Sequence, residues 1–157
     1  MKRIVFVCHG NICRSPMAEF LFKDLVKKAG VEDRFHIESR ATSSEEIIGG
    51  EGRPVYPNAR EMLASHGISC EGKTAQQLKA ADLDRFDLFI GMDSANYRNM
   101  HRILGVNEPD SRIHKLLEYA GRPGDVADPW YTRSFDVAYK DISDGCNGLL
   151  ELLLSEG

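Results

Sequence analysis

The segment Ile4-Val5-Phe6-Val7-Cys8-His9-Gly10-Asn11-Ile12-Cys13-Arg14-Ser15-Pro16 is typical of a strand, a tight loop and the start of a helix. The apolar run of residues 4–7 predicts a buried strand. Pro16 suits the first turn of a helix, where its missing N–H is not needed. Backbone N–H groups of the loop would converge on one point beside a helix N-terminus, and such an arrangement binds phosphate. The sequence therefore predicts a phosphate-binding loop between the first strand and the first helix.

Two side chains of this loop carry the predicted chemistry. Arg14 presents a planar fork of N–H donors that matches two phosphate oxygens. The same positive field favours the thiolate form of Cys8, which is a nucleophile. A free cysteine is more often a small buried hydrophobic residue. The arginine six positions later, with a strand and a helix on either side, favours the nucleophile for Cys8.

The rest of the loop is expected to support the phosphate. Gly10 permits unusual backbone dihedrals, and Asn11 tolerates the left-handed region and would hold the loop through the backbone. Ser15 would donate a hydrogen bond to the thiolate, a role compatible with that of a helix N-cap. The predicted phosphate-binding residues are His9, Gly10, Asn11, Ile12, Cys13 and Arg14.

Composition limits the classes of protein that fit. A chain of 157 residues with 42% hydrophobic and 28% charged residues predicts one globular domain spanning residues 1–157. The net charge of −4 comes without a basic block, so no nucleic-acid partner is expected. No apolar run approaches the roughly 20 residues that span a bilayer, so no membrane insertion is expected. The short apolar run near the N-terminus is interpreted as a strand and not as a signal peptide.

The four cysteines favour a reducing, cytoplasmic location. Cys8 and Cys13 share one loop, whereas Cys70 and Cys146 are isolated, so no metal-binding pattern is present.

Strand and helix patterns alternate along the chain, which is typical of a three-layer α/β domain with a parallel sheet and helices on both faces. Further strands are expected over residues 35–42 and 88–92, and residues 112–119 are ambiguous between strand and helix. Helices are expected over residues 16–30, 57–66, about 94–103 and 134–155. A long loop rich in glycine and proline follows the second strand, and such loops tend to be functional or mobile.

Transfer of a phosphoryl group from an ester requires a proton for the departing oxygen. The best candidate donor is Asp128, in Ala127-Asp128-Pro129-Trp130-Tyr131, where Pro129 biases Asp128 towards an extended conformation. Trp130 and Tyr131 offer flat apolar surfaces for a phenyl ring. The alternative interpretation is a turn before the last helix, with both aromatic side chains packed inward.

Residues 7–19, Val7-Cys8-His9-Gly10-Asn11-Ile12-Cys13-Arg14-Ser15-Pro16-Met17-Ala18-Glu19, resemble the signature of low-molecular-weight protein tyrosine phosphatases. Residues 128–131 resemble the acid loop of that family, and weaker similarities cover Ser39 to Ser43, residues 66–68 and residues 86–93. The resemblance implies a four-stranded parallel sheet, neither metal nor other cofactor, and a tyrosine-phosphorylated protein as substrate.

The resemblance also implies the roles of individual residues. Cys8 would be the nucleophile that forms a cysteinyl-phosphate, and Arg14 would clamp the phosphate. Asp128 would act first as general acid and then as general base for water. Cys13 matches a family cysteine that forms a reversible disulfide with the nucleophile; the alternative is that it only packs beneath the loop.

The segment from Ser44 to Asn58 departs from the family pattern. It is longer than usual, acidic, and has no aromatic residue before Tyr56. Glu45, Glu46 and Glu51 would disfavour acidic residues beside a phosphotyrosine, because like charges repel. The segment is expected either to set substrate choice or to form a disordered, solvated surface excursion.

Three other functions fit parts of the pattern. A thioredoxin-coupled arsenate reductase needs two further cysteines close together, and Cys70 and Cys146 are 76 residues apart. A phosphoarginine phosphatase usually carries a small polar residue where Ile12 stands. A non-enzymatic oxyanion-sensing module would be expected to lose the nucleophile or the acid, and both are retained.

Overall fold

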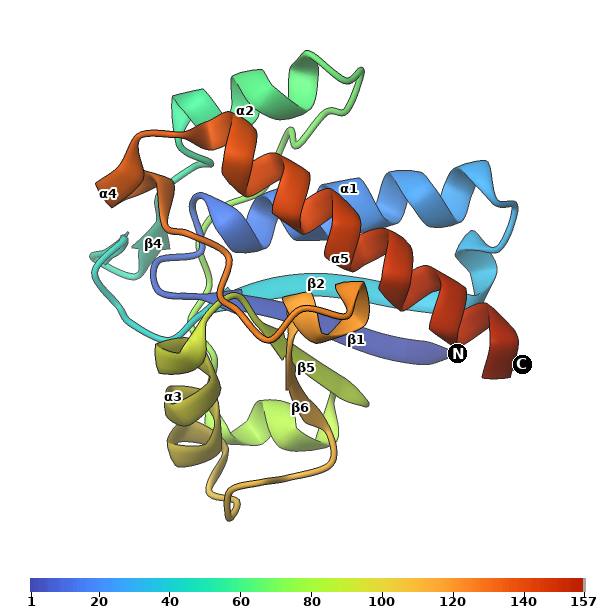
Figure 1. The fold of residues 1–157 in the computed structure, drawn as a ribbon. Coiled ribbons are helices and arrows are strands. Elements are labelled where there is room, and N and C mark those ends of the chain that lie inside the picture. Colours follow the sequence, from blue (N-terminus) through green and yellow to red (C-terminus); the bar gives the residue numbers. More distant parts are fainter. Residues whose placement is uncertain (157) are drawn as a thin grey trace.

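The computed structural model describes residues 1–156, and its centre is a sheet of four parallel strands in the order β2-β1-β5-β6 (Figure 1). The strands are β1 (Lys2–Cys8), β2 (Phe35–Ala41), β5 (Leu88–Gly91) and β6 (Ile113–Lys115). In the register, Ile4 lies opposite Ile37 on one side and Leu88 on the other. The expected α/β domain with a four-stranded parallel sheet is therefore confirmed.

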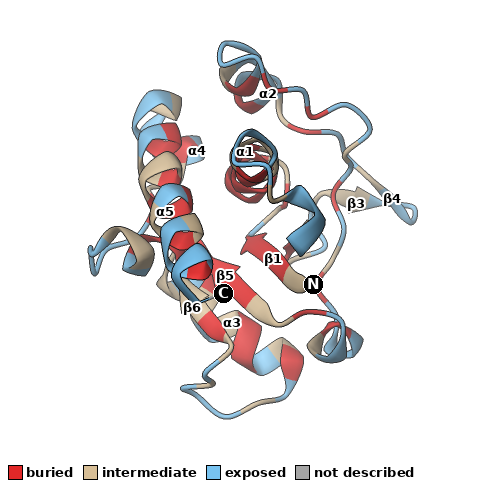
Figure 2. Cartoon of the chain, turned by 90° about the vertical axis from the view of Figure 1, so that its right-hand side faces the viewer, coloured by how far each residue is buried: buried red, intermediate tan, exposed pale blue. Residues whose placement is uncertain are grey.

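Successive residues of β1 point to opposite faces of the sheet, and each face has its own core. Ile4 and Phe6 pack with the side chains of α1 (Arg14–Lys28), α2 (Pro57–Ala64) and α5 (Phe135–Glu156). Val5 and Val7 pack on the other face, towards α3 (Ser94–Leu104) and the short helix η2 (Ala80–Asp84). Figure 2 shows the buried strands β1 and β5 between these two layers.

The predicted helices form with small shifts at their ends. Helix α1 begins at Arg14, two residues before Pro16, so Cys13 and not Ser15 occupies the N-cap position. The alternative role of Ser15 as the N-cap is thus wrong, and its hydroxyl instead contacts Cys8 and Asn11 inside the loop. Gly30 adopts φ of 71° just after α1, as expected for a glycine that ends a helix. Asp93 caps α3, accepting a hydrogen bond from the Asn96 N–H.

Residues 112–119 contain both of the structures that their sequence allowed. Ile113 pairs with Phe89 at the edge of the sheet, and the chain then enters the short helix η3 (Leu116–Ala120). Leu116 and Leu117 turn into the core beside α5. The remaining helices are η1 (Glu32–Arg34) and α4 (Pro129–Thr132).

The segment after β2 contains a small hairpin that the sequence analysis missed. Strands β3 (Ile47–Ile48) and β4 (Glu51–Gly52) pair antiparallel around Gly49 and Gly50, whose φ angles are 61° and 81°. Two consecutive left-handed glycines are typical of a type I′ hairpin turn. The Tyr56 N–H donates to the Ile12 carbonyl at 2.8 Å, which fixes the end of this segment to the phosphate-binding loop. In the structure the segment therefore contains a hairpin and is attached to the phosphate-binding loop.

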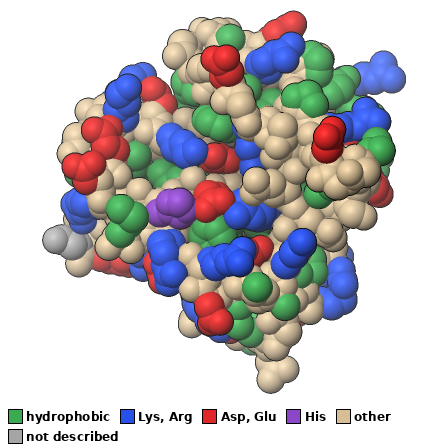
Figure 3. Space-filling view, turned by 180° about the vertical axis from the view of Figure 1, so that it is seen from behind, with side chains coloured by type: hydrophobic (Ala, Val, Ile, Leu, Met, Phe, Trp, Pro, Cys, Tyr) green, Lys and Arg blue, Asp and Glu red, His purple; other side chains and the backbone are tan. Residues whose placement is uncertain are grey.

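Charged side chains of both signs are interspersed over the face shown in Figure 3, with no single broad basic patch on that face. Among residues 1–156, no helix combines the length and hydrophobicity needed to cross a membrane. The N-terminus and the C-terminal end of α5 lie together at one end of the sheet, and the loop after β1 lies at the other (Figure 1).

Candidate active site

The loop from Cys8 to Arg14 is held open by Asn11. This residue has φ of 59°, a conformation that asparagine tolerates better than most residues. Its side-chain amide donates to the hydroxyls of Ser15 and Ser39 at 2.8 and 2.9 Å, and its side-chain oxygen accepts from the Gln76 N–H at 3.0 Å. The side chain thus ties the loop to α1, β2 and the segment near residue 76. Asn11 supports the loop as expected, although through side chains as well as backbone.

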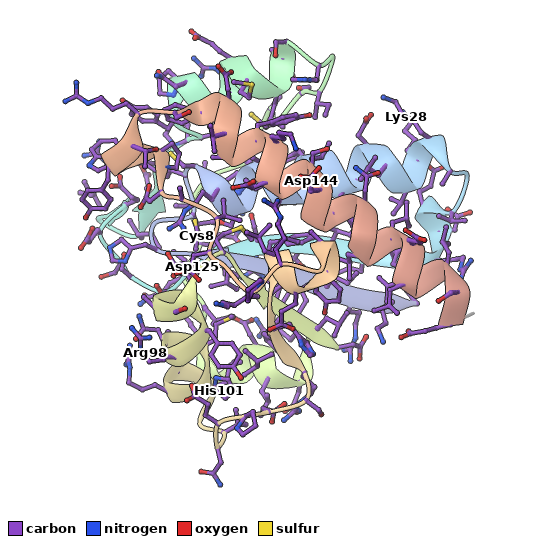
Figure 4. All side chains as sticks on the ribbon, in the orientation of Figure 1. Cys8, Lys28, Arg98, His101, Asp125 and Asp144 are labelled. Carbon is purple, nitrogen blue, oxygen red and sulfur yellow. The ribbon has the colours of Figure 1, made fainter. Side chains whose placement is uncertain are left out.

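Cys8 lies at the carboxyl end of β1, where its side chain enters the loop (Figure 4). Its Sγ lies 3.0 Å from the Ser15 hydroxyl oxygen and 3.4 Å from the Ser15 backbone nitrogen. Both groups can donate to sulfur, and α1 directs its N-terminus at the same point. Two donors and a helix N-terminus therefore surround the sulfur atom. Ser15 therefore occupies the predicted supporting position beside Cys8.

Arg14 is nearly inaccessible to solvent, at 3% exposed, and its guanidinium is held by two neighbouring loops. Nη1 donates to Asp93 Oδ2 and to the Val126 carbonyl, both at 2.9 Å, and Nη2 lies 3.5 Å from Asp128 Oδ2. Burial alone would lower the pKa of Arg14, but negative charge at Cys8, Asp93 and Asp128 outweighs it and raises that pKa. The guanidinium therefore stays charged. The contact between Asp93 and Arg14 was not predicted, because nothing in the sequence indicates that the residue capping α3 also binds an arginine.

Asp128 stands at the start of α4 with its two carboxylate oxygens in different roles. Oδ1 accepts a hydrogen bond from the Trp130 N–H at 3.0 Å, which caps the short helix. Oδ2 faces Arg14, and the carboxylate lines the same cleft as Cys8. The structure thus brings together the three residues predicted to be catalytic, from positions 8, 14 and 128.

The cleft around these groups has a volume of about 410 Å³ and opens between the phosphate-binding loop, the β3–β4 segment and α4. Trp130 and Tyr131 line it and are 59% and 84% exposed, so neither packs inward as in the alternative interpretation. The Trp130 ring is supported from behind by Tyr56, with ring centroids 5.3 Å apart. Every residue predicted to bind phosphate lines this cleft except Asn11, which is buried behind the loop.

One wall of the cleft is acidic. Glu45 and Glu46 line it, as expected for the segment after β2, whereas Glu51 does not. Glu45 pairs with His9 at 3.0 Å, and Glu46 lies 3.5 Å from Arg53. Arg53 therefore compensates part of the charge of this wall, and the expectation for Glu51 is wrong because Glu51, in β4, does not line the cleft.

A buried polar network supports the loop from below, and the sequence analysis missed it. The Ser39 hydroxyl donates a hydrogen bond to Glu19 Oε1 at 2.5 Å, and its oxygen accepts one from the Asn11 side-chain amide at 2.9 Å. Glu19 also lies 3.7 Å from Lys73, whose pKa is lowered by burial despite the negative charge of Glu19. Glu19 belongs to α1 and Lys73 to a distant loop, so only the fold brings them together.

The other cysteines are in surroundings that disfavour the thiolate. Burial raises the pKa of Cys13 to about 12, with further contributions from the negative charges of Cys8 and Asp128. Burial also raises the pKa of Cys70 and Cys146. Cys146 lies inside α5 against the Ala18 carbonyl. No disulfide links the four cysteines.

The geometry agrees with comparisons against known proteins. The family model of the low molecular weight phosphotyrosine protein phosphatases matches residues 3–157. The low molecular weight protein-tyrosine-phosphatase YfkJ of Bacillus subtilis is 38% identical over 99% of this chain and 98% of its own length. Its crystal structure superimposes with a TM-score of 0.92, covering 99% of this chain and 96% of that one. The chain therefore belongs to the low molecular weight phosphotyrosine protein phosphatase family.

Two other solved structures are similar over nearly the whole chain. SP-PTP, a low molecular weight protein tyrosine phosphatase from Streptococcus pyogenes, is 39% identical with a TM-score of 0.84, covering 98% of this chain and 93% of that one. DARP, a Drosophila arginine phosphatase, is 28% identical with a TM-score of 0.85, covering 98% of both chains. The fold is thus shared by proteins named for different phosphoryl substrates, and the site has to distinguish between them.

Proposed function

We propose that this protein is a protein-tyrosine phosphatase that hydrolyses phosphotyrosine in proteins through a cysteinyl-phosphate intermediate. The observation that carries the proposal is the convergence of Cys8, Arg14 and Asp128 on one cleft with exposed aromatic walls. In the first step the Cys8 thiolate attacks phosphorus, the bond from phosphorus to the tyrosyl oxygen breaks, and Asp128, in its protonated carboxyl form, transfers its proton to that oxygen.

In the second step, water attacks the phosphorus of the intermediate and the sulfur–phosphorus bond breaks. Asp128, now a carboxylate, takes the proton from water, and inorganic phosphate leaves. The Ser15 hydroxyl, 3.0 Å from Cys8 Sγ, stabilises the thiolate as it departs. The backbone N–H groups of residues 9–14 and the Arg14 fork bind the equatorial oxygens throughout.

Arg14 is free to bind phosphate with one edge of its guanidinium. Nη1 is occupied by Asp93 and Val126, whereas Nε has no partner among residues 1–156. The pair of N–H groups on Nε and Nη2 forms the fork that binds two oxygens of a phosphate. A dianionic phosphate would also draw Nη2 away from Asp128, whose present contact at 3.5 Å is long. Binding of the substrate would thereby release the acid for its task.

The lining of the cleft favours an aryl substrate. Ile12 and the exposed rings of Trp130 and Tyr131 provide apolar surface on both sides of a phenyl ring. A phosphoarginine side chain would place a polar guanidino group against Ile12. A thiol relay of the arsenate-reductase type would need two further cysteines close together late in the chain, and Cys70 and Cys146 are 76 residues apart in the sequence. The free thiol that this mechanism needs is maintained in a reducing, cytoplasmic location.

Two assays test the proposal. The first compares hydrolysis of matched phosphotyrosyl and phosphoarginyl peptides, and the second measures reductant-dependent turnover of arsenate, which we expect to be absent. We expect hydrolysis of the phosphotyrosyl peptide, with no detectable turnover by Cys8→Ser, since a serine hydroxyl is a poor nucleophile here. Preferential hydrolysis of the phosphoarginyl peptide, or full activity of Cys8→Ser, would contradict it.

A further inference from the structure

Two further clefts continue from the active site along the surface of the molecule. The middle cleft, of about 480 Å³, shares Ile12, Glu45, Glu46 and Trp130 with the active-site cleft. The distal cleft, of about 500 Å³, lies between the end of α2 and residues 67–73. The middle and distal clefts share Pro54, Val55 and Arg60, so the three clefts follow one another along the surface, and together they are called the groove.

The floor of the middle cleft is apolar, with Ile12, Val55 and Tyr56 among its lining residues. An extended peptide can bind such a groove by placing alternate side chains into it. The groove begins where the aryl ring of the substrate is expected to bind. The occupant that fits is therefore the chain that flanks the phosphotyrosine of the substrate protein.

Most charges that line the groove beyond the active site have partners. Glu46 lies 3.5 Å from Arg53, and Lys73 bonds to the Ser39 carbonyl at 3.0 Å and faces Glu19. Glu45 is paired with His9. Glu71 stands exposed at the far end, where it lines only the distal cleft.

Arg60 is the exception among the cations. It projects from the exposed side of α2 and, among residues 1–156, makes neither an ion pair nor a side-chain hydrogen bond. It lines both the middle and the distal cleft, so an extended occupant must pass it. A guanidinium with all five N–H groups available matches the two oxygens of a carboxylate.

We infer that Arg60 is a specificity-determining residue that binds an aspartate or glutamate of the substrate, located in the groove beyond the phosphotyrosine. The inference rests on the proposed function, because it needs a phosphotyrosyl protein as the occupant. Acidic residues next to phosphotyrosine meet the acidic wall of Glu45 and Glu46, whereas one that reaches Arg60 meets an uncompensated cation. The effect of an acidic residue of the substrate on binding thus depends on its position relative to the phosphotyrosine.

Steady-state kinetics on phosphotyrosyl peptides with a single aspartate moved through each flanking position test this inference. For the wild type, aspartate at one position or two neighbouring ones should lower KM about 1.4-fold to fivefold relative to alanine, the range of an exposed ion pair, with kcat unchanged. The gain should fade as salt is added. Arg60→Gln should abolish the preference, and Arg60→Glu should transfer it to lysine at the same position.

Arg98→Glu is the matched control, because Arg98 is an exposed arginine on α3, on the opposite face of the sheet from α2 (Figure 4). It should keep the wild-type preference. Equal KM values for all aspartate positions, or a preference that survives in Arg60→Glu, would overturn the role of Arg60. Failure of the wild type to hydrolyse p-nitrophenyl phosphate and the parent peptide would instead refute the proposed function.

Discussion

Replacement of Arg14 by lysine keeps the positive charge of this residue but removes the planar pair of N–H groups that can bind two phosphate oxygens. In the structure Nη1 is committed to Asp93 and Val126, so the single nitrogen of a lysine would be held by the same two groups. The phosphate would lose its contacts with Nε and Nη2. Two charge-assisted hydrogen bonds, each worth about 1.5–3 kcal/mol, amount to about 3–6 kcal/mol. The expected loss in kcat/KM is therefore roughly 10²–10⁴-fold.

The assay is hydrolysis of p-nitrophenyl phosphate, with thermal unfolding as a check on the fold. The substituted lysine still neutralises Asp93, so the variant should remain folded. The control is Arg98→Lys, which changes an exposed arginine outside the cleft and should keep full activity. A folded Arg14→Lys variant with a loss below about tenfold would refute the argument that the Arg14 fork clamps the transferring phosphoryl group.

Three more predictions concern the acid, the second cysteine and the loop that carries Asp128. Asp128→Asn should slow hydrolysis of phosphotyrosine by roughly 10²–10⁴-fold but that of an activated aryl phosphate much less; equal losses would show that Asp128 only positions the loop. Mild peroxide should oxidise Cys8 to a sulfenic acid, which the Cys13 thiol then converts to a disulfide with release of water, so that thiol reductants restore activity. Sulfinic acid at Cys8 with no linked peptide in the mass spectrum would show that Cys13 only packs beneath the loop. Lys115 Nζ donates to Asp125 Oδ1 at 2.9 Å and to the Pro123 carbonyl at 3.3 Å, and so positions the loop just before Asp128. Lys115→Met should therefore reduce the turnover of substrates with poor leaving groups about twofold to fivefold. Lys140→Met, which removes an exposed pair with Asp144, is the control, and equal effects of both changes would argue against a role for Lys115 in positioning.

Local sequence patterns were sufficient for three of the four strands of the sheet and for the phosphate-binding loop, whereas β6 stayed ambiguous and the number of four strands came from the family resemblance. The apolar run of β1, Pro16 and the spacing of Cys8 and Arg14 are neighbours in the chain, so short-range chemistry determines their arrangement. Asp128 was found by chemical reasoning, since a phosphoryl transfer needs a proton donor and the residues around it are stiff and aromatic.

Contacts between distant parts of the chain were not accessible to that reasoning. Asp93 faces Arg14 across 79 residues, and Glu19 meets Lys73 only after the sheet has assembled. Gly49-Gly50 is a local sequence feature that indicates the β3–β4 hairpin, whereas no local feature indicates the hydrogen bond that attaches Tyr56 to Ile12. The partial neutralisation of the acidic wall likewise depends on Arg53 folding towards it.

The cysteinyl-phosphate is tested most directly by rapid acid quenching during turnover of p-nitrophenyl phosphate, followed by mass spectrometry of the peptide that contains Cys8. The proposed mechanism predicts one phosphate on the Cys8 sulfur in the wild type, more of it in Asp128→Asn when an activated substrate is used, and none in Cys8→Ala. Continued turnover with no phosphate on Cys8, or with phosphate on another residue, would contradict it.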